Sequence, residues 1–309
     1  MAGGLNRRAT NFVQQTSPPV ATRLCWMSGR PRVAFVIPIA SPQMVNDWHL
    51  ASVCFKQTLL SIFNSTNRNY CVVAAGHEPP DLQLPRDSRF KFLSLDHPLP
   101  REENSPWIAK VKDKMIKLEA AWIYAKSKWN PQYVMKVDWD DLLSSSLVGW
   151  LNTAKGAAGY RMKDGWVWNS GSRHLITYSE TFDLVCGTCL IIRSDLADKK
   201  GPFLNSMDGI ELDEMSKRIE ATDNRSLVPG AGTGSLLLND SHGRAEAQFR
   251  YLGHQLGIVP FRAAVYRLRN PQNVISQRGY HRHSVRWLLG KIRRTRLITQ
   301  SLRREFMLF

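Results

Sequence analysis

The sequence predicts an α/β fold with a mainly parallel central sheet flanked by helices. Short, nearly all-apolar runs alternate with longer segments whose apolar residues recur at helical spacing, a pattern typical of βαβ units. The short runs are apolar throughout, as expected of parallel strands that are covered on both faces. The chain has 309 residues, of which 43% are hydrophobic, and this is enough for one large core.

The first strand, helix and second strand are expected between residues 33 and 75. Residues 33–39 (VAFVIPI) are almost entirely apolar, which indicates a buried strand. A polar loop leads into residues 48–63, where Trp, Leu, Val and Ile recur at roughly helical spacing. A polar turn then separates this helix from residues 70–75 (YCVVAA), the second strand.

The third strand, second helix and fourth strand are expected next. Residues 89–95 alternate weakly between polar and apolar side chains, as a strand does. Residues 107–127 place Ile116, Ala120 and Ile123 on one side of a helix. Residues 133–137 (YVMKV) form the fourth strand.

The pattern changes after residue 141. Within residues 160–176, Trp166 and Trp168 lie between the turn-forming dipeptides Asp164-Gly165 and Ser170-Gly171, which indicates antiparallel strands. The remaining expected segments are an apolar run at 184–192, a loop and helix at 195–220, a Gly-containing loop with a short apolar run at 226–239, and the last core strand within 257–268.

Three carboxylates follow the fourth strand, at Asp138, Asp140 and Asp141. Clustered acids beside a buried strand cost free energy unless a cation or polar ligand compensates them. Mg²⁺ and Mn²⁺ favour carboxylate oxygens, often together with substrate phosphates. Because ligands of parallel sheets bind beyond the carboxyl ends of the strands, we predict a metal–diphosphate site there. The alternative is that the acids cap a helix beginning at residues 142–143, although a cap needs only one acid.

These residues resemble the GT-A family of nucleotide-sugar glycosyltransferases, and most of all the family-2-type bacterial enzymes that include a rhamnosyltransferase group. The resemblance covers residues 33–276. It depends on the Ile-Pro-Ile exit of the first strand, the Asp-x-Asp after the fourth, and the Cys-Gly-Thr that enters a later apolar strand. His242 and the segment Ala264-Val265-Tyr266 add to it. The resemblance implies a GT-A (Rossmann-like) fold.

The resemblance also implies a donor site. Asp140 would hold Mn²⁺ or Mg²⁺, Asp138 would contact the metal and the ribose or base, and Asp141 would be an auxiliary acid. His242 would complete the metal shell or remain structural. The other implied donor contacts are Pro38, Ile39, Glu78, Lys114 and Trp139.

The catalytic base has two candidate groups. Family-2 enzymes usually supply it from a Glu-Asp pair near a helix start, and this chain has no such pair. Asp240 and His242 are preferred, because they follow an apolar stretch and a Gly-rich loop. Asp213, among the acids of residues 208–214, is the other candidate. The stereochemical outcome of transfer therefore stays open.

The net charge of +16 favours anionic partners. Residues 278–309 carry nine Lys/Arg and one acid, and apolar side chains are interleaved with them at near-helical spacing over 284–309. This predicts a basic amphipathic helical tail, which would lie either on an anionic membrane surface or on the catalytic domain with its basic face in solvent. The sequence does not favour nucleic acid as a partner, because it contains no recognisable nucleic-acid module.

Cysteine usage and the N-terminus favour a cytoplasmic protein, or one bound peripherally at the inner face of the plasma membrane. The five cysteines are too few and too apolar in context for a disulfide framework. Residues 1–32 are polar and basic, without a secretory signal, and are expected to be disordered. The predicted division is 1–32, a GT-A domain at 33–276 with donor half 33–141 and acceptor half 142–276, and the tail at 277–309.

The sequence thus predicts a metal-dependent glycosyltransferase that moves a hexose or deoxyhexose from a nucleotide-sugar to a hydroxyl of a glycan or lipid-linked glycan. Two other classes stay open. One is a catalytically inactive GT-A-like binding or scaffold protein, which the missing Glu-Asp pair favours. The other is a basic membrane or nucleic-acid adaptor whose acids are structural.

Overall fold

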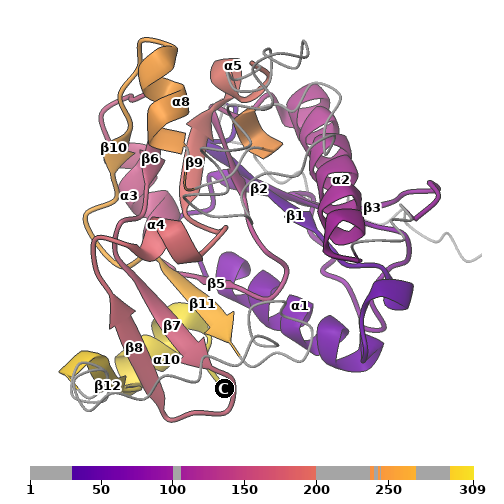
Figure 1. The fold of residues 1–309 in the computed structure, drawn as a ribbon, viewed down its shortest axis with the longest axis horizontal. Coiled ribbons are helices and arrows are strands. Elements are labelled where there is room, and N and C mark those ends of the chain that lie inside the picture. Colours follow the sequence, from indigo (N-terminus) through magenta and orange to yellow (C-terminus); the bar gives the residue numbers. More distant parts are fainter. Residues whose placement is uncertain (1–29, 100–105, 200–236, 240–242, 244, 269–292) are drawn as a thin grey trace, which may run out of the picture.

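A computed structural model describes residues 30–99, 106–199, 237–239, 243, 245–268 and 293–309. These residues form two β-sheets with helices packed on them (Figure 1). The α/β prediction is therefore confirmed, with a second sheet that the sequence reading did not separate from the first. Residues 1–29 and 200–236 lie outside the described chain, and so do the predictions made for them.

The first sheet has the order β10-β6-β9-β4-β1-β2-β3. The four strands expected in the first half of the chain are all present and mutually parallel. β9 runs antiparallel to both β4 and β6, so the sheet is mixed on that side. Its strands are β1 (Val33–Pro38), β2 (Tyr70–Gly76), β3 (Phe90–Ser94), β4 (Tyr133–Lys136), β6 (Gly159–Arg161), β9 (Leu190–Arg193) and β10 (Gly257–Ile258).

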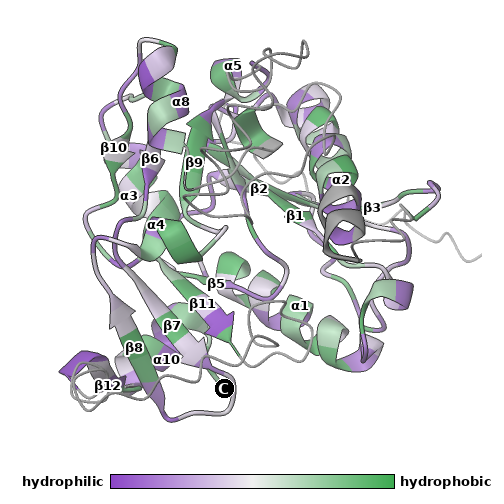
Figure 2. Ribbon diagram, viewed as in Figure 1, coloured by the Kyte–Doolittle hydropathy of each residue, from purple (hydrophilic) through white to green (hydrophobic). Residues whose placement is uncertain are grey.

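The central strands are buried on both faces, as their continuous apolar runs predict. Every residue of β1, β2 and β4 is buried. Figure 2 shows this region of the first sheet as green, hydrophobic ribbon. Because no strand in the centre has a polar face, helices or loops must cover both sides.

Two long helices supply that cover. α2 (Pro106–Trp129) packs on β1 and β2, with Trp122 fully buried. α1 (Trp48–Phe63) begins at Asp47, whose carboxylate accepts a hydrogen bond from the backbone N–H of Leu50 at 2.8 Å and so caps the helix. Phe63 at its end packs edge-on against Tyr70 of β2, and the helix also contacts β5 of the second sheet, so α1 touches both sheets.

The second sheet has the order β12-β8-β7-β11-β5. β7 and β8 form the antiparallel hairpin expected near residues 160–176, and Gly171 in its turn has a φ of +82° that suits glycine. The strands are β5 (Leu142–Leu143), β7 (Gly165–Asn169), β8 (His174–Tyr178), β11 (Ala264–Leu268) and β12 (Thr295–Leu297).

Two apolar runs fold differently from their expectation. The run at 184–192 is a strand only from Leu190, because Phe182–Val185 form a short helix, α4. The run at 257–268 divides into β10 and β11, which belong to different sheets. The other short helices are η1 (Pro42–Met44), α3 (Leu147–Thr153), α5 (Ser194–Ala197), η2 (Leu237–Asn239) and α8 (Ala245–Tyr251).

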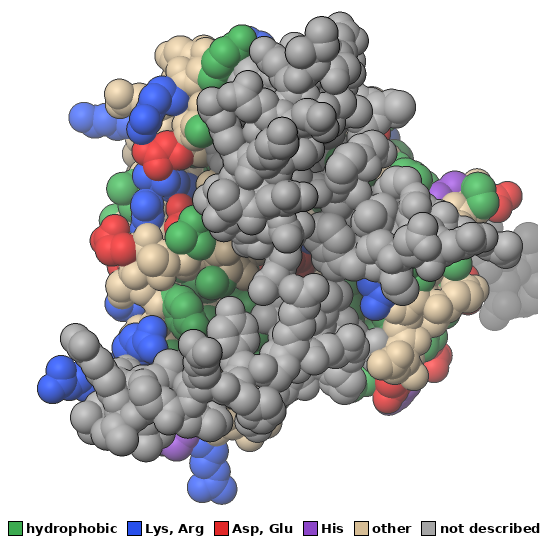
Figure 3. All heavy atoms as spheres, in the orientation of Figure 1, with side chains coloured by type: hydrophobic (Ala, Val, Ile, Leu, Met, Phe, Trp, Pro, Cys, Tyr) green, Lys and Arg blue, Asp and Glu red, His purple; other side chains and the backbone are tan. Residues whose placement is uncertain are grey.

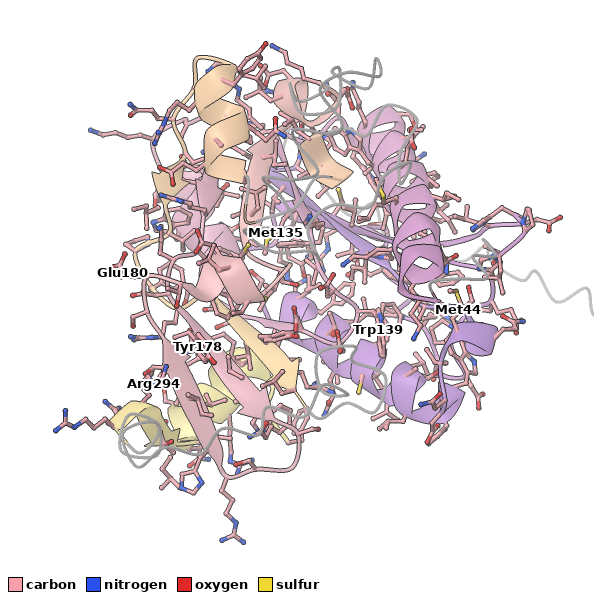
Figure 4. The ribbon with its side chains drawn as sticks, in the orientation of Figure 1. Met44, Met135, Trp139, Tyr178, Glu180 and Arg294 are labelled. Carbon is pink, nitrogen blue, oxygen red and sulfur yellow. The ribbon has the colours of Figure 1, made fainter. Side chains whose placement is uncertain are left out.

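The C-terminal segment corrects the prediction of a continuous amphipathic helix over 284–309. Residues 269–292 lie outside the described chain, residues 293–294 are helical, β12 then pairs with β8, and α10 (Gln300–Phe306) follows. Phe306 and Leu308 are buried against the second sheet. The segment 293–309 therefore completes a core, and Arg294 stacks on Tyr178 of β8 with its guanidinium carbon 5.6 Å from the ring centre (Figure 4).

The basic residues of the described chain are spread out. On the face drawn in Figure 3, the coloured Lys and Arg side chains stand apart along the left and lower rim, with Asp and Glu among them. Arg303 and Arg304 of α10 are exposed. Among the described residues, no helix is both long enough and apolar enough to cross a membrane.

Candidate functional site

The three acids lie in residues 137–141, the turn that links the two sheets and is named the acid turn below. β4 ends at Lys136, the backbone N–H of Asp141 donates to the carbonyl of Asp138 at 3.1 Å, and β5 begins at Leu142. The carbonyl of Trp139 accepts a hydrogen bond from Thr58 of α1 at 2.8 Å, which ties the turn to that helix. Because residues 142–143 form a strand, the alternative that the acids cap a helix there is wrong.

Asp138 is the acid with the clearest polar partners. Its Oδ1 lies 2.5 Å from Nζ of Lys114 on α2, and its side chain is 23% exposed. Burial lowers the pKa of Lys114, but the ion pair with Asp138 and the nearby Asp141 and Asp140 outweigh burial and raise it above its usual value. Lys114 therefore stays cationic beside the acid cluster.

Asp140 and Asp141 are both buried, with exposed fractions of 8% and 0%. Asp141 accepts hydrogen bonds from the thiol of Cys186 at 3.4 Å and from the backbone N–H of Arg267 at 3.2 Å. Burial, followed by the charges of Asp140 and Asp138, raises the pKa of Asp141 well above its usual range. Asp141 is thus bonded to the protein interior, while Asp138 faces a cation.

The Cys-Gly-Thr segment before β9 packs against the acid turn, and each of its three residues lies close to one of the acids. Besides the bond from Cys186 to Asp141, the hydroxyl of Thr188 accepts a hydrogen bond from the backbone N–H of Asp138 at 2.9 Å. A Cβ added to Gly187 would lie 2.8 Å from Oδ2 of Asp138. Burial and then the charge of Asp141 raise the pKa of the Cys186 thiol, so it remains a donor.

The other predicted donor contacts occupy the same edge of the first sheet. Pro38 ends β1, and Ile39 continues the pairing by donating to the carbonyl of Ala75 at 2.8 Å. Glu78 is exposed just beyond β2. Trp139, labelled in Figure 4, lies on the acid turn.

The candidates for the catalytic base cannot be placed. Asp213, Asp240 and His242 all lie outside the described residues. The implied third metal ligand, His242, is therefore untested, and so is the choice between the two candidate groups.

A second polar cluster at this edge was missed by the sequence analysis. His77 follows β2, His97 follows β3, and Asp113 lies on α2, one residue before Lys114. The three side chains present ligand atoms within 4.8 Å of one another. The sequence could have indicated this cluster, because both histidines come just after predicted strands, and the carboxyl ends of parallel strands lie at one edge of the sheet.

Comparisons with known proteins give only distant similarity. No protein-family profile matches the chain, and no curated protein matches it. Residues 1–349 of TarS from S. aureus are 10% identical with a TM-score of 0.37, covering 76% of this chain and 60% of that one. The glycosyltransferase GlyE of Streptococcus pneumoniae TIGR4 is 8% identical with a TM-score of 0.31, covering 75% and 46%. The chain thus spans less than two thirds of either structure.

Proposed function

We propose that this chain is a metal-dependent glycosyltransferase with a GT-A fold. It would transfer a hexose or deoxyhexose from a nucleoside-diphosphate sugar to a hydroxyl of a glycan or lipid-linked glycan. The observation that carries the proposal is the turn after β4, which holds three carboxylates beside a lysine at the carboxyl edge of parallel strands. This edge is where α/β sheets bind their ligands.

The donor atoms of the turn suit a hard divalent cation. Asp138 and Asp140 offer carboxylate oxygens, which Mg²⁺ and Mn²⁺ prefer, and Asp141 is already bonded to Cys186 and Arg267. When bound, the metal would stabilise the negative charge that develops on the leaving nucleoside diphosphate. Lys114 would exchange its bond to Asp138 for one to a phosphate oxygen.

The remaining roles follow the resemblance described above. Pro38, Ile39 and Glu78 would line the nucleotide end of the site, because they lie beyond β1 and β2 at the same edge. Asp240, His242 or Asp213 would deprotonate the acceptor hydroxyl. A lipid-linked acceptor would bring the exposed Arg303 and Arg304 near an anionic surface.

A nucleotide panel tests the proposal. Melting temperatures of the full chain are measured with nucleoside diphosphates and nucleotide-sugars, with Mn²⁺ and with chelator, since a ligand that binds only the native state raises the melting temperature. We expect a metal-dependent rise with one nucleotide family. Asp140→Asn should abolish it, and Glu119→Gln, which removes an exposed carboxylate of α2, should not.

Sugar transfer or hydrolysis is then measured with the nucleotide that binds. Metal-dependent sugar release by the wild type supports the enzyme. Binding without release would favour the inactive scaffold class, and no shift with any nucleotide would contradict both. Salt-sensitive binding to lipid or nucleic acid that survives Asp140→Asn would favour the adaptor class.

A further inference from the structure

We propose that His77, His97 and Asp113 form a second metal site, selective for Zn²⁺ or a similar first-row transition metal. The site is distinct from the acid turn and does not depend on the proposed glycosyl transfer. Its ligands come from the loop after β2, the loop after β3 and helix α2, so residues far apart in sequence meet at one place.

The ligand atoms are close enough to share one cation. Oδ1 of Asp113 lies 3.3 Å from Nε2 of His97 and 3.8 Å from Nδ1 of His77. The centres of the two imidazole rings lie 4.2 Å apart, and the ring planes are tilted by 36°. Two atoms bound at about 2.0–2.2 Å to one metal stand at most about 4.4 Å apart, so both Asp113 distances fit one cation as they are. The three ligand atoms lie within 4.8 Å of one another, so the two imidazole nitrogens need at most a small rotation to share it.

Two of these side chains carry buried polar atoms that make no hydrogen bond within the described part of the chain. Asp113 is 3% exposed, yet its Oδ1 accepts no hydrogen bond from the described part of the chain. Nδ1 of His97 is likewise without a partner among the described residues, and the one contact of its Nε2 there is the 3.3 Å ion pair with Oδ1 of Asp113, whose geometry is not that of a hydrogen bond. Buried polar groups are rarely left so, and a cation between Oδ1 and Nε2 would satisfy both atoms.

The hydrogen bonds of His77 prepare it as a ligand. Its Nε2 lies 2.9 Å from the backbone carbonyl of His97, a group that only accepts, so Nε2 carries the proton. The lone pair is then on Nδ1, the nitrogen nearest Asp113. An outer N–H bonded to a backbone carbonyl is the usual support of a metal-bound histidine.

Lys117 and Ser41 complete this arrangement. Nζ of Lys117 donates to Oδ2 of Asp113 at 2.5 Å and to Oγ of Ser41 at 2.9 Å, which leaves the Ser41 hydroxyl proton for Nδ1 of His77, 2.6 Å away. Lys117 thus occupies Oδ2 and leaves Oδ1 for the metal. On metal binding, the Ser41 hydroxyl must rotate away from His77.

The donor set identifies the class of metal. Two imidazole nitrogens and one carboxylate oxygen suit Zn²⁺ and its neighbours, whereas Mg²⁺ prefers oxygen ligands alone. Burial, then the neighbouring His77, lowers the pKa of His97, which favours the neutral imidazole that binds a metal. The carboxylates of Asp138 and Asp140 would take a hard cation instead, so the two sites differ in preference.

Helix α2 connects the proposed second metal site to the acid turn. Asp113 precedes Lys114 on α2, and Lys114 contacts Asp138 of the acid turn. A metal bound by His77, His97 and Asp113 would therefore hold the loops after β2 and β3 against α2, the helix whose Lys114 contacts the acid turn.

Cobalt spectroscopy on the metal-depleted full chain tests the proposal. Co²⁺ in a four-coordinate nitrogen–oxygen site gives strong visible d–d absorption, and zinc that shares the site removes the band. We expect one Co²⁺ per chain, displaced by one Zn²⁺. His97→Ala should weaken Co²⁺ binding at least about tenfold, since even outer-shell changes cost this much. His49→Ala, an exposed histidine of α1, should leave it unchanged.

Two more variants keep the outcome decisive. Asp113→Asn should also lose the band, although it leaves the buried Lys117 without its counter-charge and can impair folding. His97→Ala leaves the ion pair of Lys117 with Asp113 in place and avoids this. Asp140→Asn should retain the band, which separates this site from the donor site. No band in the wild type, an unchanged band in His97→Ala, or a band lost in Asp140→Asn would overturn the proposal.

Discussion

Gly187 lies directly against Asp138: a Cβ at position 187 would stand 2.8 Å from the Oδ2 atom of that carboxylate. Real Cβ contacts are almost never so short, so any other residue at 187 must push the carboxylate aside. The glycine thus makes room for Asp138, the acid to which we assign the proposed donor site. The contact is between the turn after β4 and the segment before β9, which are about fifty residues apart in sequence.

Gly187→Ala should therefore lower sugar transfer with little loss of stability. The methyl group displaces Asp138 rather than backbone, and a small misplacement of a metal ligand costs about 10- to 100-fold in kcat/KM. Gly156→Ala is the control, because a Cβ there meets nothing within 4 Å. Steady-state kinetics and thermal melting of both variants make the comparison, and full activity of Gly187→Ala would contradict the assignment of Asp138.

Lys114→Met should change metal and nucleotide binding in opposite directions. Loss of the ammonium removes a cation that competes with the metal at Asp138, so Mn²⁺ alone should bind more tightly. The nucleoside diphosphate loses a charge-assisted hydrogen bond and should bind about tenfold more weakly. Calorimetric titration of metal and of nucleotide separates the two effects. Nucleotide binding that is unchanged or tighter in the variant would show that Lys114 contacts no phosphate.

Asp141→Asn should alter the pH dependence of stability. The native pKa of Asp141 is raised, mainly by burial, so above pH 3.8 the native state holds a proton that the unfolded state releases. The wild type therefore loses stability as pH rises from there through the native pKa, by at most about 1.4 kcal/mol per pH unit from this group. The variant lacks this loss, and its stability relative to wild type should rise with pH.

Urea unfolding at several pH values measures that difference. Asn keeps one oxygen to accept from Cys186 or Arg267 and loses the other acceptor, a change that does not vary with pH, so the pH dependence of the difference isolates the charge. A constant difference between variant and wild type across the window would mean that the carboxyl is already ionised in the native state.

Phe306→Ala should strongly destabilise the protein. Phe306 is fully buried between α10 and the second sheet, and truncating such a side chain costs about 3–5 kcal/mol. Phe309→Ala is the matched control, since Phe309 is 68% exposed and its loss should change stability by less than about 0.5 kcal/mol. Denaturant unfolding of both tests whether the C-terminus belongs to the core; equal stabilities would support a detached tail.

Local pattern was sufficient for much of the fold. The apolar runs that became β1, β2 and β4 are buried over their whole length, and the helical spacing at 48–63 coincides with α1. The acids were expected at the end of β4, and they lie there. These features were predictable because burial on two faces leaves a continuous apolar run in the sequence itself.

The tertiary structure alone decided what distant segments do together. The basic, apolar C-terminus is ambiguous by composition, and only the pairing of β12 with β8 and the burial of Phe306 make it part of a core. Likewise His77, His97 and Asp113 have no common local pattern, and strand order together with the packing of α2 brings them within reach of one ion. Residue type and period record how each segment is buried, whereas the contacts between segments arise from chain topology, which no local pattern contains.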